Sequence, residues 1–313
     1  MGHVAKWSAS ILSMLFIISG CSQTSVPPSN THKEAVKVTK GAPALPPRSP
    51  RTDHSHLKGD DLLVKHQHKQ SKIEKKLKQS TTWANFNIPI LEMHDTIAIP
   101  NDPYTMSPAQ LDEELGWLKS HGFHSVTLND IYNAIYNHYP LPSRPIALTF
   151  DDGYESNFIT ATPLLQKYGF IATEFMVSGF IGRHGFLTAD ELKQMEASHT
   201  WDIECHTVDH PNLSKLNFSD ITFQVTQSKD TLQSLLGTQV DYFAYPYGYY
   251  NGRVLRALMH AGYRLAVCTR QGYANPSTDG PLLLNRIAIH QGLPLQAYAQ
   301  LFAPSLVTPI SSS

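Results

Sequence analysis

The chain has 313 residues, 41% hydrophobic and 16% charged, so it is long enough to form one large domain with a substantial core. A formal net charge of −1 gives no indication of a general nucleic-acid-binding protein. The charge is unevenly distributed, because residues 31–80 contain 12 Lys and Arg against 5 Asp and Glu, whereas residues 85–313 contain 12 against 21. A basic segment therefore precedes an acidic domain.

The first 20 residues have the pattern of an export signal peptide. Lys6 precedes the apolar run Ile11–Ile18, which is too short to span a bilayer as an ordinary helix. The run ends in "IISGC", where the small residues before Cys21 resemble the lipobox of bacterial lipoproteins. This resemblance implies cleavage before Cys21 and lipid attachment to it, which would anchor the protein to a membrane outside the cytoplasm. The alternative is a plain secretory signal with a chance cysteine.

Residues 21–84 are expected to form a disordered tether. They are rich in Ser, Pro, Lys and His, and "APALPPRSP" favours an extended polyproline-like chain. The four histidines between residues 54 and 68 could bind metal weakly, but a solvated basic linker drawn to anionic surfaces is the favoured interpretation.

From residue 85 to residue 313 the sequence alternates between predicted strands and helices. Strands are expected at 86–94, 144–150, 171–177, 201–206, 240–248, 263–269 and 282–290, with a brief extended piece at 124–130. Helices are expected at 108–121, 131–139, 156–169, 188–198, 219–237, 251–262 and 293–302. About seven such units favour a parallel α/β sheet that closes, or nearly closes, into a barrel. No Gly-x-Gly-x-x-Gly follows the first strand, so dinucleotide binding is not indicated.

Acidic and imidazole side chains follow two of these strands. Asp151 and Asp152 come directly after "IALTF", and His206 and His210 follow "WDIEC". In a parallel barrel, side chains at the carboxyl ends of the strands meet at one face. One Asp and two His form a ligand set for a divalent metal with open positions for water and substrate. The alternative for the Asp pair alone is to cap the helix that begins a few residues later.

The motifs "TFDDG" and "HTVDHP" resemble the first two motifs of the NodB-homology polysaccharide deacetylases, carbohydrate esterase family 4. The similarity covers about residues 86–302 and includes "IPILEMH", "FAYPYG", "AGYRLAV" and "LNRIAI". It implies a distorted (β/α)7-type barrel and a metal-dependent hydrolase. It also implies that Asp151 is the catalytic base and that the metal ligands are Asp152, His206 and His210.

The resemblance assigns further residues to the site. Thr207 matches a position that helps to hold the loop, and the turn after residue 244 matches the part that binds acetate. In this turn the Tyr247 N–H is the expected donor to the oxyanion, since Pro246 has no N–H. The residues expected at the substrate are His94, Tyr154, Thr207, Tyr245, Pro246, Gly248 and Arg286.

Several positions depart from the family pattern. Many members have an Arg in the third motif that orients the base, and "FAYPYG" has none, so Arg270 or Arg286 could compensate. Arg286 could equally form a structural ion pair. His290 is the candidate general acid, with a solvent-facing loop histidine as the alternative. Glu174 replaces an expected aromatic residue, and the sequence offers no account of it.

The expected function is therefore removal of N-acetyl groups from a β-linked N-acetylglucosamine polysaccharide. The opening "IPILEMH" and the Arg-free turn resemble the branch that acts on poly-β-1,6-N-acetylglucosamine. Peptidoglycan is the alternative substrate, and a non-catalytic glycan-binding lipoprotein is the alternative of another class. Zn²⁺ fits the Asp-His-His set best, with Co²⁺, Ni²⁺ or Mn²⁺ as other candidates. We expect a monomer.

Overall fold

The computed structural model describes residues 87–100 and 102–302. The export signal, Cys21 and the tether lie outside the described residues. The strands are β1 (Ile90–Met93), β2 (Asp95–Thr96), β3 (Thr105–Met106), β4 (His124–Ser125), β5 (Pro145–Asp152), β6 (Ala172–Met176), β7 (Trp201–Cys205), β8 (Tyr242–Ala244), β9 (Leu265–Gln271) and β10 (Leu284–Ala288). The helices are α2 (Pro108–Ser120), α3 (Leu128–Asn137), α4 (Thr162–Tyr168), α5 (Ala189–Ala197), α6 (Phe218–Leu236), α7 (Gly252–His260), α8 (Pro276–Asp279) and α9 (Leu295–Gln300).

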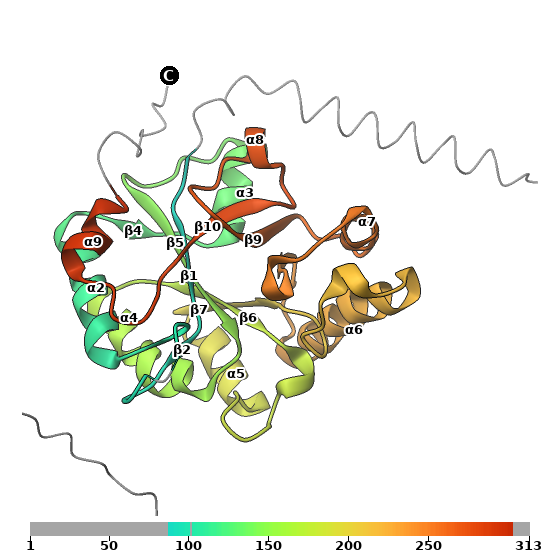
Figure 1. Cartoon of the computed structure of the whole chain (residues 1–313), viewed down its shortest axis with the longest axis horizontal. Helices are drawn as coiled ribbons and strands as arrows, with labels where there is room; N and C mark the ends of the chain where they lie inside the picture. The colour runs from blue at the N-terminus through green and yellow to red at the C-terminus, as the bar shows by residue number, and fades with distance from the viewer. Residues whose placement is uncertain (1–86, 101, 303–313) are drawn as a thin grey trace, which may run out of the picture. The chain divides into compact units, whose positions relative to one another are not determined.

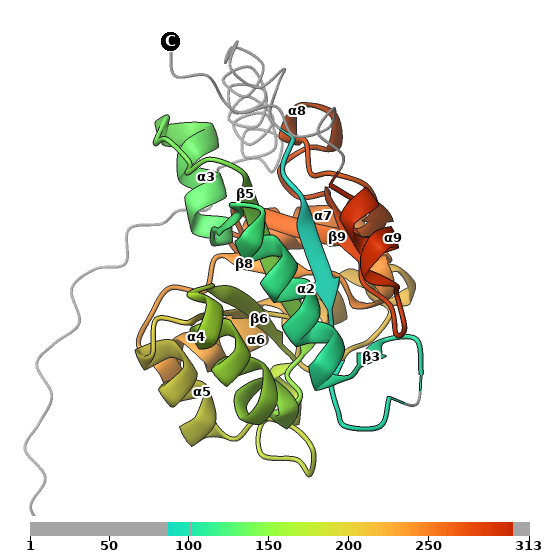
Figure 2. The ribbon, with the colours of Figure 1, turned by 90° about the vertical axis from the view of Figure 1, so that its left-hand side faces the viewer.

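Seven parallel strands of the described chain close a ring. β1 pairs with β5, the ring continues through β6, β7, β8, β9 and β10, and β10 pairs with β1 again. The ring is irregular, because β7 and β8 share a single residue pair and β10 shifts register against β9 between Leu284 and Arg286. β4 pairs only with the first two residues of β5. The predicted distorted seven-stranded barrel is confirmed, and Figures 1 and 2 show its helices arranged around the outside of the strands.

Alternate residues of each strand belong to different parts of the core. Ala147 of β5 packs in one buried cluster with Ile90 and Phe175 from neighbouring strands. Leu148, the next residue, belongs to a second cluster, which contains residues of α2, α4 and α6. Because side chains alternate along a strand, residues 149 and 151 face the same side as Ala147, the barrel interior. This alternation directs Asp151 into the barrel mouth.

Local sequence signals set the helix boundaries, with one prediction corrected. Thr188 and Glu191 form the expected capping box of α5. The extended piece expected at 124–130 was wrong beyond residue 125, because a second capping box, Thr127 with Asp130, starts α3 at Leu128. The helix expected at 156–169 begins as a π-helical turn, Asn157–Ala161, before α4. The side chains of Asp151 and Asp152 do not cap this helix, which has no side-chain cap.

Candidate active site

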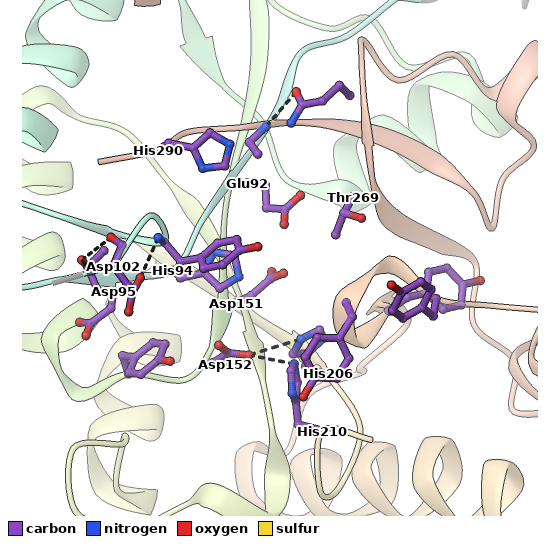
Figure 3. A pocket seen from close by; sticks show the side chains of 18 residues that line it. Glu92, His94, Asp95, Asp102, Asp151, Asp152, His206, His210, Thr269 and His290 are labelled. Atoms are coloured by element: carbon purple, nitrogen blue, oxygen red, sulfur yellow. Dashed lines mark hydrogen bonds and ion pairs between the residues drawn. The ribbon is translucent and has the colours of Figure 1, made fainter. Parts of the chain in front are cut away.

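A cavity of about 520 Å³ opens at the carboxyl ends of the strands. This is the face where barrel loops place reactive groups. Its lining includes the carboxyl groups of Glu92, Asp95, Asp102, Asp151 and Asp152, the imidazoles of His94, His206, His210 and His290, and the rings of Tyr104, Tyr154, Tyr245, Tyr247 and Tyr249. Figure 3 shows the labelled members of this set around the cavity.

The three predicted metal ligands lie together in the cavity. Asp152 Oδ1 is 3.5 Å from His206 Nε2 and 3.3 Å from His210 Nε2 (Figure 3). Each residue offers one ligand atom, and these atoms all lie within 4.8 Å of one another. Asp152 Oδ1 is buried and has no hydrogen-bond partner in the described chain. A carboxylate oxygen without a donor, facing two imidazole nitrogens, fits a divalent cation bound by one oxygen and two nitrogen ligands.

Backbone and neighbouring groups fix the orientation of both imidazoles. His206 Nδ1 is 2.8 Å from the Ala244 carbonyl oxygen, which can only accept, so Nδ1 carries the proton and Nε2 faces the site. The His210 N–H donates to Thr207 Oγ1 at 3.0 Å. Burial lowers the pKa of His210 to about 4, so its ring is neutral at pH 7 and keeps a lone pair for a metal. Thr207 is completely buried and does not line the cavity, so it holds the loop rather than contacting a substrate there.

The backbone is strained where it presents these residues. Positive φ angles occur at Asp152 (81°), Thr207 (71°), His210 (55°) and Tyr247 (58°). Non-glycine residues in this region are uncommon and cost roughly 1–3 kcal/mol each. The described chain has three more non-glycine residues with positive φ, His138, Arg144 and His199, and none of these lines the cavity. The other four lie at or next to the cavity, where such strain is common.

Arg286 holds Asp151 with two parallel hydrogen bonds. Its Nη1 donates to Asp151 Oδ1 at 2.8 Å and its Nη2 donates to Oδ2 at 2.7 Å. Arg286 is fully buried, and it also donates to Thr149 Oγ1 and the Cys268 carbonyl. Burial alone would raise the pKa of Asp151, but the guanidinium outweighs it and holds that pKa well below the usual range. Asp151 is therefore ionised and fixed in orientation.

This pair decides between the alternatives that the sequence left open. Arg286, not Arg270, holds Asp151, the expected base, since Arg270 is exposed and donates to the Leu283 carbonyl. Arg286 was also expected at the substrate, but it is buried behind Asp151 and does not line the cavity. Its link to the cavity runs through Asp151.

Glu92 is a residue of this site that sequence reasoning missed. It is 4% exposed, lines the cavity, and its Oε2 lies 3.4 Å from Arg286 Nε without a hydrogen-bond partner in the described chain. Burial raises the pKa of Glu92. Glu92, His94 and Asp151 are also close enough to hold a cation, but Arg286 already supplies the positive charge there. The sequence does contain a signal that could have revealed Glu92. It is a charged residue in an otherwise apolar strand, two positions before His94 and therefore on the same face of the strand.

Comparisons with known proteins agree with this geometry. The profile of the family described as polysaccharide deacetylase matches residues 138–266, which include the three metal-site residues and Asp151. The chain is 29% identical over 234 residues to YxkH of Bacillus subtilis (strain 168), whose name marks it as a candidate polysaccharide deacetylase, with 74% of this chain and 82% of YxkH covered. The chain also resembles a solved structure, the Streptococcus pyogenes deacetylase PplD in complex with acetate. It is 29% identical to PplD with a TM-score of 0.66, and the match covers 71% of this chain and all of PplD.

The chain contains a polysaccharide deacetylase domain. Members of this family are hydrolases that act on N-acetyl amides. A further relative is the poly-β-1,6-N-acetyl-D-glucosamine N-deacetylase of Staphylococcus aureus (strain MRSA252), which is 30% identical over 190 residues. That alignment covers 56% of this chain, and the chain spans 65% of the length of the staphylococcal enzyme.

The third-motif turn of this deacetylase lies beside the metal-site residues. The Tyr247 ring lies edge-on to His210, with 4.6 Å between centroids, and Gly248 packs against Thr269 so closely that a Cβ would meet Thr269 Oγ1. Tyr245 is buried, although it borders the cavity, and donates from its hydroxyl to the Leu282 carbonyl. Pro246 is buried, and neither Pro246 nor Gly248 is part of the cavity lining. Tyr247 is thus the exposed member of the turn.

His94 and His290 also line the cavity. Tyr104 connects them, with ring centroids 5.1 Å from His94 and 6.2 Å from His290. Gln110 holds the His290 loop, because its Nε2 donates to the His290 carbonyl and its Oε1 accepts from Gly292 N–H. His290 therefore borders the cavity on a loop anchored to α2.

Proposed function

We propose that this deacetylase is metal-dependent and removes N-acetyl groups from a β-linked N-acetylglucosamine polysaccharide, with poly-β-1,6-N-acetylglucosamine as the favoured polymer. The observation that carries the chemistry is a buried Asp152 oxygen that accepts no hydrogen bond in the described chain and faces two imidazoles, beside an aspartate held by a buried arginine. Zn²⁺ is the favoured cation for this ligand set.

The residues around the cavity suit amide hydrolysis. A cation held by Asp152, His206 and His210 would polarise the acetamide carbonyl and lower the pKa of a water molecule. Asp151 accepts a proton from the attacking water, and Arg286 keeps its carboxylate directed at the cavity. The Tyr247 N–H donates to the oxyanion that develops on the amide carbonyl oxygen when water attacks the amide carbon. His290 donates a proton to the leaving amine, which departs poorly as an anion.

The cavity rim suits a sugar polymer. Tyr104, Tyr247 and Tyr249 are each more than half exposed, and they line the cavity together with Tyr154. Exposed aromatic rings provide flat apolar surfaces on which sugar rings can stack. The name of the staphylococcal relative supports the β-1,6-linked polymer as substrate.

The substrate proposal is tested by offering purified, Zn²⁺-loaded protein three acetylated polymers and measuring the free amine and acetate released. The polymers are poly-β-1,6-N-acetylglucosamine, peptidoglycan glycan strands and chitin oligomers, and the first is expected to react fastest. Faster release from peptidoglycan would overturn the polymer assignment but not the chemistry. Glycan binding by the metal-loaded protein without acetate release would instead favour a non-catalytic glycan-binding protein.

His290→Ala is expected to slow deacetylation by about 10²–10⁴-fold, because the leaving amine would lose its proton donor. Hydrolysis of an aryl acetate ester should change little in the same variant, because a phenolate leaves without protonation. Metal content should stay at the wild-type level. Equal losses on the amide and the ester, or an unchanged rate on both, would contradict a role as general acid.

We further propose that the protein is a lipoprotein exported from the cytoplasm and anchored through Cys21. The support is the lipobox-like sequence and the basic tether that follows it. In the described part of the chain, no helix has the length and apolar character needed to cross a membrane.

Cys21→Ala is expected to move the protein from the membrane fraction to the soluble extracytoplasmic fraction, since the lipid attachment atom would be absent. Cell fractionation followed by immunoblotting measures this shift. Cys205→Ala, a change at a buried cysteine of the catalytic domain, serves as the control and should leave the protein with the membranes. Membrane retention of the Cys21 variant would contradict the lipid anchor.

A further inference from the structure

Glu174 is a buried carboxyl group that lies beside the end of β5 but does not line the cavity. It is 0% exposed, and it belongs to β6, where it lies opposite Phe150 of β5. Its neighbour Phe175 packs in the cluster inside the barrel, so alternation places Glu174 on the outer face of the strand. A carboxyl group at such a position is costly to bury unless its oxygens are bonded.

Both oxygens of Glu174 bind the segment that follows Asp152. The Gly153 N–H donates to Glu174 Oε1 at 2.9 Å, and Asn157 Nδ2 donates to Oε2 at 2.8 Å. The first bond fixes the peptide unit that joins Asp152 to Gly153. The second fixes the start of the π-helical turn, so one side chain holds both ends of the bend between β5 and the next helix.

The backbone of this bend has unfavourable dihedral angles, so hydrogen bonds from other segments are needed to hold it. Asp152 has φ 81° and Gly153 has φ 86°, so two consecutive residues adopt the left-handed region. Gly153 is also tightly packed, because a Cβ there would lie 2.1 Å from Met176 Sδ. The Gly153 carbonyl accepts from Leu187 N–H at 2.9 Å. Glu174 and Leu187 therefore hold Gly153 through its N–H and its carbonyl.

We propose that Glu174 is a positioning residue that fixes the Asp152–Gly153 peptide and thereby directs Asp152 toward His206 and His210. The inference rests on the proposed role of Asp152 as a metal ligand. It gives a function to the one residue of β6 for which the sequence offered no account. A small rotation of the Asp152–Gly153 peptide would move the Asp152 carboxylate away from the two imidazoles.

The geometry predicts which substitutions Glu174 tolerates. Burial raises the pKa of Glu174 well above its usual range, so a neutral side chain of the same shape should replace it. In Glu174→Gln, the amide oxygen can accept from Gly153 N–H. The amide nitrogen can donate to Asn157 Oδ1 once the Asn157 side-chain amide turns over, because its Nδ2 faces that position in the wild type and its Oδ1 has no partner in the described chain. In Glu174→Leu the size is retained but both acceptors are lost. In Glu174→Asp the carboxyl group is retained but withdrawn by one methylene group.

The experiment titrates each metal-free protein with Co²⁺ and measures affinity from the visible absorption bands. Glu174→Gln should bind Co²⁺ within about twofold of the wild type, whereas Glu174→Leu and Glu174→Asp should bind about 10- to 100-fold more weakly. Glu114→Leu is the matched control, because Glu114 is an equally buried carboxyl on α2 away from the metal site. Its Co²⁺ affinity should equal that of the wild type even if its melting temperature falls.

The outcomes separate this inference from the proposed function. A wild-type protein without Co²⁺ bands would overturn the metal site and this inference with it. Normal wild-type binding with unchanged affinity in Glu174→Asp and Glu174→Leu would overturn the positioning role alone. Weak Co²⁺ binding by Glu174→Gln, equal to that of Glu174→Asp, would also overturn the positioning role. The role requires that a neutral side chain of the same length can replace Glu174. If Glu174→Leu does not fold, Glu174→Asp still decides the question.

Discussion

Asp151→Asn is expected to lower the rate of deacetylation by about 10²–10⁴-fold while leaving the metal content unchanged. The substitution keeps the size of the side chain but removes the charge that accepts a proton from water. It also places an amide NH₂ group against the Arg286 guanidinium, which now binds both carboxylate oxygens. Metal analysis and the release of acetate from acetylated polymer measure the two effects on one sample.

His210→Ala is the contrasting control for Asp151→Asn. His210 Nε2 lies 3.3 Å from Asp152 Oδ1, within the set of candidate ligands, so its removal should lose both metal and activity. If Asp151→Asn loses its metal as His210→Ala does, Asp151 is a ligand and not the base. A variant Asp151→Asn with wild-type turnover would exclude either role.

The barrel could be predicted from the sequence because its signals are local. Strand and helix patterns repeat about seven times, and each strand that carries a motif ends at the motif. That the three candidate metal ligands lie together could be predicted because Asp152, His206 and His210 stand at or just after the ends of two of these strands. Parallel pairing through β5, β6 and β7 then brings the strand ends together.

The supporting residues depend on pairings that a single sequence does not show. Arg286 and Asp151 are 135 positions apart, and they meet because β10 and β5 both border β1 in the closed ring. Which of two arginines reaches the base follows from strand register, including the shift between β10 and β9. Glu174 is similar, because its partners at Gly153 and Asn157 become neighbours only when β6 pairs with β5.

Arg286→Met is expected to lower the free energy of unfolding by about 3–5 kcal/mol, because removing one partner leaves a buried charge uncompensated. Two carboxyl groups lose their cation, since Asp151 Oδ2 lies 2.7 Å and Glu92 Oε2 3.4 Å from the guanidinium. Activity should fall as well, because Asp151 loses the group that orients it. Urea unfolding in the presence of a chelator measures the change in the free energy of unfolding without a contribution from bound metal.

The loss of folding stability caused by Arg286→Met should grow as the pH rises from 5 to 8. In the wild type, burial raises the pKa of Asp151 but the guanidinium outweighs it and holds that pKa below the unfolded value. The Asp151–Arg286 pair therefore stabilises the fold at pH values above the pKa that Asp151 has in the unfolded chain. This stabilisation is lost as the pH falls through the lower pKa that Asp151 has in the folded protein. Without the guanidinium, burial raises the pKa of both carboxyl groups above their unfolded values, so ionising them costs more stability as the pH rises.

Two further variants show whether the effect comes from these buried charges. Adding Glu92→Gln to Arg286→Met should recover part of the lost stability, because one of the two uncompensated carboxylates is then neutral. Arg264→Met removes a half-exposed arginine 3.0 Å from Asp241 and should change stability by less than about 1 kcal/mol, since Lys229 still pairs with that carboxylate. A loss in Arg286→Met as small as in Arg264→Met, with no dependence on pH, would mean that Asp151 is not held by charge. The orientation of Asp151 would then have to come from the strand itself.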